Sequence, residues 1–335
     1  MKLKLFTGIT LAVVLTAGLW LWFHHQPQPA EQPVSKLVKP DIASLPKPVP
    51  ANAPKMTTVT SKPASVQSQT LSPATSDWSA VQQIVDSRAS YEERLNAISS
   101  LSTRLTDTDW DVLQPFLLKP DGLDKGQLEQ VIKNQLLDAL CALNPPPAGL
   151  GDVLTQMYRD HQQDEVIRDY AVQHLAAYYE QMTSQRNSAR TQQSVQDVLW
   201  EAVNETSDSI GGTALLALKR LSQEYTGFDQ GKMATTALQM AGDNNAGELT
   251  HITAFQVCAQ MGTADALPVM LQAAQNGETI SVRMSAIGAL GLLGGPEQIP
   301  FLNSVLAGTE DRLKPAAQHA LEQITTRQTQ LASQK

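Results

Sequence analysis

The chain has 335 residues, of which 33 are acidic and 25 are basic, giving a net charge of −8 at neutral pH. The basic excess is +2 in the first 23 residues and +3 in residues 24–76, so residues 77–335 carry −13. A region this acidic repels phosphate backbones, which excludes nucleic acid as an expected partner.

An uncharged run at residues 5–23 predicts a transmembrane signal-anchor helix. Its 19 residues span about 28 Å as a helix, close to the thickness of a bilayer's hydrocarbon core. A cleaved signal peptide has a shorter apolar stretch and a small-residue cleavage site, whereas this run ends with Trp20, Trp22 and Phe23. Lys2 and Lys4 precede the span, so residues 1–4 are expected in the cytoplasm and the remainder outside it. The predicted location is the bacterial inner membrane, with the repeat domain periplasmic.

Residues 24–76 contain ten of the chain's 19 prolines, mixed with Ala, Ser, Thr, Gln and Lys. This composition offers too few apolar residues to offset the entropy of an ordered chain. The segment is therefore predicted to be a disordered Pro-rich linker, and it acts either as a stiffened spacer or as a plain tether.

Residues 77–327 show helical spacing of apolar residues and an internal repeat. A polar or small residue is followed three positions later by an apolar one and four positions after that by another. Such recurrence of helix pairs, here every 31 to 43 residues, is typical of an α-solenoid. The prediction is an all-α domain of about six to seven helix pairs, with a longer loop at residues 183–193, which are rich in Ser, Thr, Gln and Arg, and a polar tail at residues 328–335. The seven motifs are Arg94/Ala97/Leu101, Lys133/Leu136/Leu140, Arg168/Ala171/Leu175, Gly211/Ala214/Leu218, His251/Ala254/Cys258, Arg283/Ala286/Leu290 and Lys314/Ala317/Leu321.

Two of these motifs carry a family resemblance. Val282-Arg283 with Ala286 and Leu290, and Ile167-Arg168 with Ala171 and Leu175, resemble the first helix of HEAT and HEAT-like repeats. The resemblance implies the fold, and it leaves the function open because this family includes scaffolds, transport adaptors and a few enzymes. Its hydroxylases need His-Glu pairs for a di-iron centre, and this sequence contains no His-Glu dipeptide.

No pattern in the sequence predicts catalysis, a cofactor or a metal site. Cys141 and Cys258 lie three repeats apart, too far for a disulfide, and are expected to be unpaired and buried. The histidines are scattered singly, and the acidic run Asp107-x-Asp109-x-Asp111 lacks the glycine and terminal glutamate of a calcium-binding loop. The chain is therefore predicted not to be an enzyme.

The leading functional hypothesis is a membrane-tethered, extracytoplasmic scaffold or adaptor that binds a protein or peptide through the second helices of its repeats. Trp110 and Trp200 lie in two such helices and are candidate anchors, with core packing as the alternative for each. Two other hypotheses stay open. One is a lyase-type HEAT-like enzyme with an unlocated site, and the other is a cell-envelope structural protein that binds cell-wall material.

Overall fold

The computed structural model describes residues 78–334, with gaps at 102–104, 121–125 and 183–187. The predicted membrane helix at residues 5–23 and the linker at residues 24–76 lie outside the described residues. Among the described helices, none is both long enough and apolar enough to span a bilayer. The described residues make up the predicted repeat domain.

These residues form fourteen α-helices, three short 3-10 helices and no strand. The prediction of an all-α fold is therefore confirmed for the described part of the chain. In chain order the helices are α2 (Trp78–Val85), α3 (Tyr91–Ser99), α4 (Asp107–Leu118), α5 (Gly126–Ala142), α6 (Leu150–Arg159), α7 (Glu165–Met182), α8 (Ser188–Ala202), α9 (Ile210–Glu224), α10 (Gln230–Gly242), α11 (Glu248–Met261), η1 (Ala264–Ala266), α12 (Leu267–Asn276), α13 (Ile280–Leu293), η2 (Pro296–Gln298), α14 (Ile299–Ala307), η3 (Asp311–Leu313) and α15 (Lys314–Ser333).

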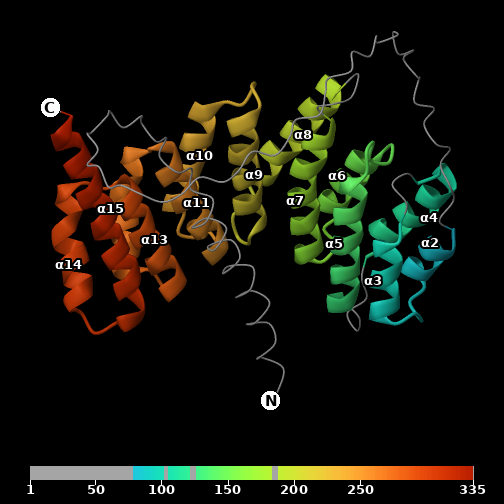
Figure 1. Ribbon diagram of the computed structural model, residues 1–335, viewed down its shortest axis with the longest axis horizontal. Coiled ribbons are helices and arrows are strands. Elements are labelled where there is room, and N and C mark those ends of the chain that lie inside the picture. The colour runs from blue at the N-terminus through green and yellow to red at the C-terminus, as the bar shows by residue number, and fades with distance from the viewer. Residues whose placement is uncertain (1–77, 102–104, 121–125, 183–187, 335) are drawn as a thin grey trace, which may run out of the picture. The chain divides into compact units, whose positions relative to one another are not determined.

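The helices alternate between two layers. The odd-numbered helices form one layer, called the odd layer, and the even-numbered helices form the other, called the even layer. In the odd layer each helix from α3 to α13 packs against the next odd-numbered helix. In the even layer α2 packs against α4, α4 against α6, α6 against α8, and α10 against α12. The layers are joined because even helices also pack on the odd helix that follows, as α6 does on α7 and α12 on α13. Figure 1 shows the helix pairs following one another in chain order from α2 to α15.

The seven predicted first-helix motifs fall in the odd layer, one in each of the seven odd-numbered helices from α3 to α15. Ala171 and Leu175 of α7, and Ala286 and Leu290 of α13, have no exposed surface. Each buried leucine contributes about 1.5–3 kcal/mol, and the small alanines allow neighbouring helices to approach. The odd layer therefore forms the centre of the core. The motif is incomplete in the first repeat, because α3 ends at Ser99 and Leu101 is only partly buried.

The side chain of the first motif residue donates a hydrogen bond to a carbonyl group at the end of the preceding even-numbered helix. Arg94 Nε donates a hydrogen bond of 2.7 Å to the carbonyl oxygen of Ile84, and Arg168 Nε donates one of 2.7 Å to that of Tyr158. The last carbonyls of a helix have no donor within the helix, and cations there also interact favourably with its dipole. Lys133, His251 and Arg283 make the same kind of bond to the carbonyl oxygens of Lys119, Asp243 and Ala274.

Two of these arginines also tie their repeat to the next one. Arg94 forms a forked ion pair with Glu129 at the start of α5, with nitrogen–oxygen distances of 2.6 and 2.8 Å. Arg168 pairs with Glu205, in the segment between α8 and α9, at 2.7 and 2.8 Å. Because both guanidinium groups are buried, removing either one would strand a carboxylate and a carbonyl group together.

We expect Arg168→Met to lower the free energy of unfolding by about 3 kcal/mol, at the low end for a broken buried pair because Glu205 keeps 26% of its side chain exposed. Arg168→Lys should recover only part of this, since one ammonium nitrogen cannot take the positions of both Nε, which bonds Tyr158, and Nη2, which bonds Glu205. Urea denaturation measures the loss. The control is Arg88→Gln, whose pair with Asp86 is exposed; an equal shift of the midpoint in both variants would contradict the prediction.

One glycine lets the last two odd helices approach closely. A Cβ atom at Gly291 of α13 would lie 2.7 Å from Cα of Ala320 in α15. Heavy atoms cannot pack at that distance, so any side chain at Gly291 would push α15 away. Gly288, one turn earlier in the same helix, has open space at its Cβ position.

Gly291→Ala should therefore destabilise the domain by about 1–3 kcal/mol through overpacking. The matched variant Gly288→Ala should be neutral or should stabilise it by up to about 1 kcal/mol, because alanine is the better helix former. Thermal unfolding of the two variants beside the parent chain gives the comparison. The account of this contact is wrong if Gly288→Ala proves the more damaging change.

The structure corrects two predicted boundaries. Residues 188–193, predicted as loop, begin helix α8, and α15 continues to Ser333 through most of the predicted polar tail. The end of α15 is held because Arg327 donates hydrogen bonds to the carbonyl oxygens of Gly291 and Gly294. Its outward-facing residues are polar and exposed, as in the capping helix of a repeat stack. They include Gln318, Glu322, Thr325 and Thr329.

Candidate partner-binding surface

Trp110 belongs mainly to the core. It lies on α4 with 9% of its surface exposed and borders a hollow of about 150 Å³. Nearby, Asp109 and Thr106 cap the start of α4 reciprocally, so the predicted acidic run serves as a helix start. The other wall of the hollow is the turn between α5 and α6, with residues Leu143, Pro145, Pro146, Pro147 and Ala148.

Trp200 lies at the surface of the even layer, near the end of α8. Its ring is partly buried, and Nζ of Lys232 on α10 lies 3.9 Å from the ring centroid. A cation at this distance over an indole face gains about 0.5–1 kcal/mol at an exposed site. The contact links α8 to α10 through side chains. The two predicted tryptophans are thus not brought together, since α6 lies between α4 and α8 in the even layer.

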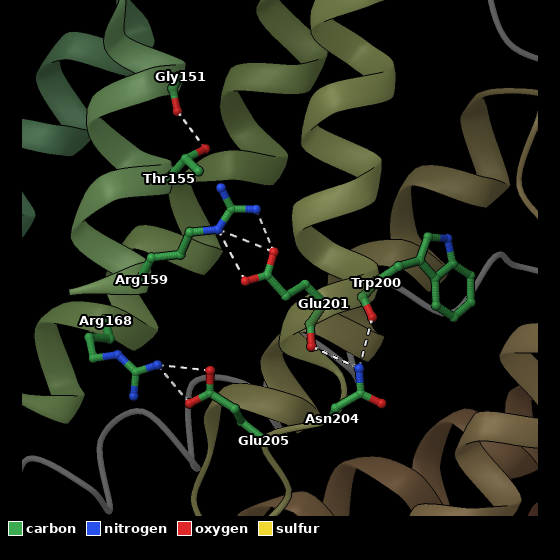
Figure 2. Close-up of polar contacts among 8 residues, drawn as sticks. All are labelled: Gly151, Thr155, Arg159, Arg168, Trp200, Glu201, Asn204 and Glu205. Atoms are coloured by element: carbon green, nitrogen blue, oxygen red, sulfur yellow. Dashed lines mark hydrogen bonds and ion pairs between the residues drawn. The ribbon is translucent and has the colours of Figure 1, made fainter. Parts of the chain in front are cut away.

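Polar groups surround the base of Trp200. Arg159 of α6 forms a bidentate ion pair with Glu201 of α8, and Asn204 donates hydrogen bonds to the carbonyl oxygens of Trp200 and Glu201 at 3.3 and 3.0 Å. Figure 2 shows Arg159 and Glu201 facing each other between the two helices, while the Trp200 ring points away from them. Both charged side chains are about half exposed, so this pair is accessible from solvent.

An aromatic cluster supports the turn that leads to Lys232. Tyr179 of α7 lies 5.4 Å from the ring of Tyr225 and 5.8 Å from that of Phe228, centroid to centroid. Gln196 of α8 donates a hydrogen bond to the Tyr179 hydroxyl. The α9–α10 turn is thereby fixed beside α8, which places α10 within reach of Trp200.

Sequence patterns missed Arg159, Glu201, Asn204 and Lys232 as parts of this surface. Arg159 and Glu201 are 42 positions apart, so their meeting depends on how two repeats stack. The one usable signal was a tryptophan on a second helix, which identified the location but none of its neighbours.

Both cysteines and one of the histidines, His174, are buried. Cys141 and Cys258 are free and buried, as predicted, and burial raises the pKa of each thiol to about 12. His174 is buried against Asn134. Across the described residues, no three His, Cys, Asp or Glu side chains are grouped so that they could hold a metal ion.

Residues 238–322, from α10 to α15, match the family model for HEAT repeats. This segment of the chain is therefore HEAT-like, in agreement with the resemblance seen in the motif of Arg283, Ala286 and Leu290. No curated protein matches its sequence. Among solved structures, human deoxyhypusine hydroxylase in complex with glycerol is similar at 15% identity and a TM-score of 0.34, over 75% of this chain and 96% of that one. A likeness this distant carries no argument about the activity of this HEAT-like chain.

Proposed function

We propose that the chain is a membrane-tethered HEAT-repeat scaffold or adaptor that binds a protein or peptide partner and is not a catalyst. The observation that carries the proposal is the surface around Trp200, where an accessible tryptophan, a lysine above its ring and an Arg–Glu pair come from three successive even helices. Aromatic and arginine side chains are the residues most enriched among those that dominate interface energies.

The arrangement suits a partner rather than a small molecule. The surface is open and built from rigid helices, so its side chains are already placed when a partner arrives. Trp200 supplies apolar area, and Arg159, Glu201 and Asn204 supply a polar rim. We refer to Arg159, Trp200, Glu201, Asn204 and Lys232 as the Trp200 surface.

The location is a separate part of the proposal. Its support is the sequence of residues 5–23 and the proline-rich segment that follows, which would hold the repeat domain on the periplasmic side of the inner membrane. The acidic charge of residues 77–335 fits a soluble domain carried at a distance from anionic lipid headgroups.

Trp200→Ala should weaken partner binding by at least about 30-fold, the loss typical of a central interface residue. In vivo crosslinking followed by co-purification with the parent chain identifies the partner, and binding to that partner is then measured for each variant. Thr235→Ala, an exposed change on α10, is the matched control, and circular dichroism checks folding. Equal partner recovery by Trp200→Ala and the parent chain would rule out this surface.

A charge swap tests the rim independently of the tryptophan. Arg159→Glu should lower partner binding, because it places two carboxylates side by side and reverses one charge of the rim. The double variant Arg159→Glu with Glu201→Arg restores the ion pair in reverse. If the partner needs the positive charge on α6 and the negative charge on α8, binding stays low in the double variant while its stability returns to that of the parent chain.

The tether is tested by fractionation of bacterial cells. The full chain should stay with the membrane after carbonate extraction, and a protease should reach its repeat domain only once the outer membrane is opened. Deletion of residues 5–23 should release the chain. Recovery of the intact chain in the cytosolic fraction would refute the proposed location without affecting the Trp200 surface.

A further inference from the structure

Helix α7 separates two interfaces with opposite titration behaviour. It packs against α5 on one side and α9 on the other. The α5 side carries a buried histidine and the α9 side a partly buried carboxylate, and neither takes part in the Trp200 surface. The charged and titratable groups that face α7 include Asp138 and Cys141 on α5, Tyr158 on α6, Glu205 after α8, Asp208 before α9, Arg220 on α9 and Tyr225 after it, with Asp164, Glu165, Arg168 and Glu180 on α7 itself.

His174 is the buried group on the α5 side. It is 6% exposed, and its Nε2 lies 2.9 Å from Oδ1 of Asn134, a distance that suits a neutral imidazole donating its proton. Burial lowers the pKa of His174, and the Asp138 carboxylate, 3.8 Å away and largely exposed, offsets this only in part. A proton added here would place a positive charge inside the α5–α7 interface.

Asp169 is the partly buried group on the α9 side. Its Oδ2 accepts a hydrogen bond of 2.9 Å from the Ser209 hydroxyl at the N-cap of α9. Its Oδ1 is buried and accepts no hydrogen bond of normal geometry from the described part of the chain. Burial raises the pKa of Asp169, and the charge of Asp208 adds to this, while Ser209, Thr213 and Gln173 act in the opposite direction.

Other carboxylates lie near Asp169 at the start of α7. Partial desolvation raises the pKa of Glu165, and the carboxylates of Asp208, Asp164 and Asp169 raise it further. Arg168 acts in the opposite direction, but it is engaged by Glu205 and by the carbonyl of Tyr158. Carboxylates therefore cluster at the start of α7, whereas the cation that α9 contributes, Arg220, pairs with Glu180 near the other end of α7.

We propose that α7 is a pH-responsive element: mild acidification loosens its packing against α5 and tightens its packing against α9. The segment at residues 205–209 would transmit the change, because it is bonded both to α7 and to the next repeats. Ser209 bonds Asp169, Thr206 bonds Asp243, and the carbonyl oxygen of Asp208 accepts from Thr250.

Acidification changes the stability of the two interfaces in opposite directions. His174 has a lowered pKa in the folded state, so below pH of about 6.5 the unfolded chain takes up the proton first and the fold loses stability. Asp169 and Glu165 have raised pKa values in the folded state, so the folded chain takes up protons first as pH falls from neutral. Protonation of these carboxyls therefore raises the free energy of unfolding until the pH reaches their ordinary pKa values, near about 4.

The test is hydrogen exchange of the full-length chain at pH 7.5 and pH 5.0, corrected for intrinsic exchange rates, with urea midpoints at both values. On acidification, exchange in α5 should rise by at least about threefold and exchange at the start of α9 should fall. His174→Gln should abolish the first change and Asp169→Asn the second. Asp169→Asn should also raise the urea midpoint at pH 7.5 and not at pH 4.

Two exposed variants, His161→Gln and Asp111→Asn, serve as controls and should leave both changes intact. Asp138→Asn is a surface change that avoids core misfolding; it should enlarge the acid-induced rise in α5 exchange by removing the opposing charge. The proposal is overturned if the effects of His174→Gln and Asp169→Asn are the same at both pH values, or if acid loosens both interfaces together.

Discussion

The carbonyl groups at the end of each even helix impose the constraint on which the stack depends. They have no donors within their own helix, and they face the next odd helix. A side chain from the first motif position supplies the donor in most repeats. In α9 that position is Gly211, where the backbone N–H donates to the carbonyl oxygen of Glu205 at 2.8 Å. A Cβ atom at Gly211 would lie 2.4 Å from that oxygen, so only glycine permits the approach.

This constraint also determines which charges are left for a partner. Arg94, Lys133 and Arg168 are buried and committed to internal carbonyls, so they cannot contribute to an interface. The accessible cations of the Trp200 surface, Arg159 and Lys232, lie on the even layer. Buried cations of the odd layer thus join the repeats, and the even layer presents the side chains of the Trp200 surface.

The spacing of apolar residues located the odd helices correctly because burial on one face of a helix requires that period. The first motif position was recognised as polar or small, but its role as a donor was not. Its acceptor lies six to fourteen residues upstream, at or beyond the end of the preceding helix, and the intervening turn varies between repeats. The start of α8 and the end of α15 were missed because both segments are polar, and contacts with neighbouring helices hold them.

The sequence by itself determined the all-helical class, the repeat and the identity of the core-facing helices, since these depend on local period and composition. It also supplied the proposed anchor and linker. Only the tertiary structure decided which tryptophan reaches solvent, because the exposure of Trp110 and Trp200 depends on the turn or helix that packs beside each. It likewise decided that Arg159 meets Glu201 and that Lys232 covers Trp200. Contacts between repeats depend on stacking geometry, which no single repeat encodes.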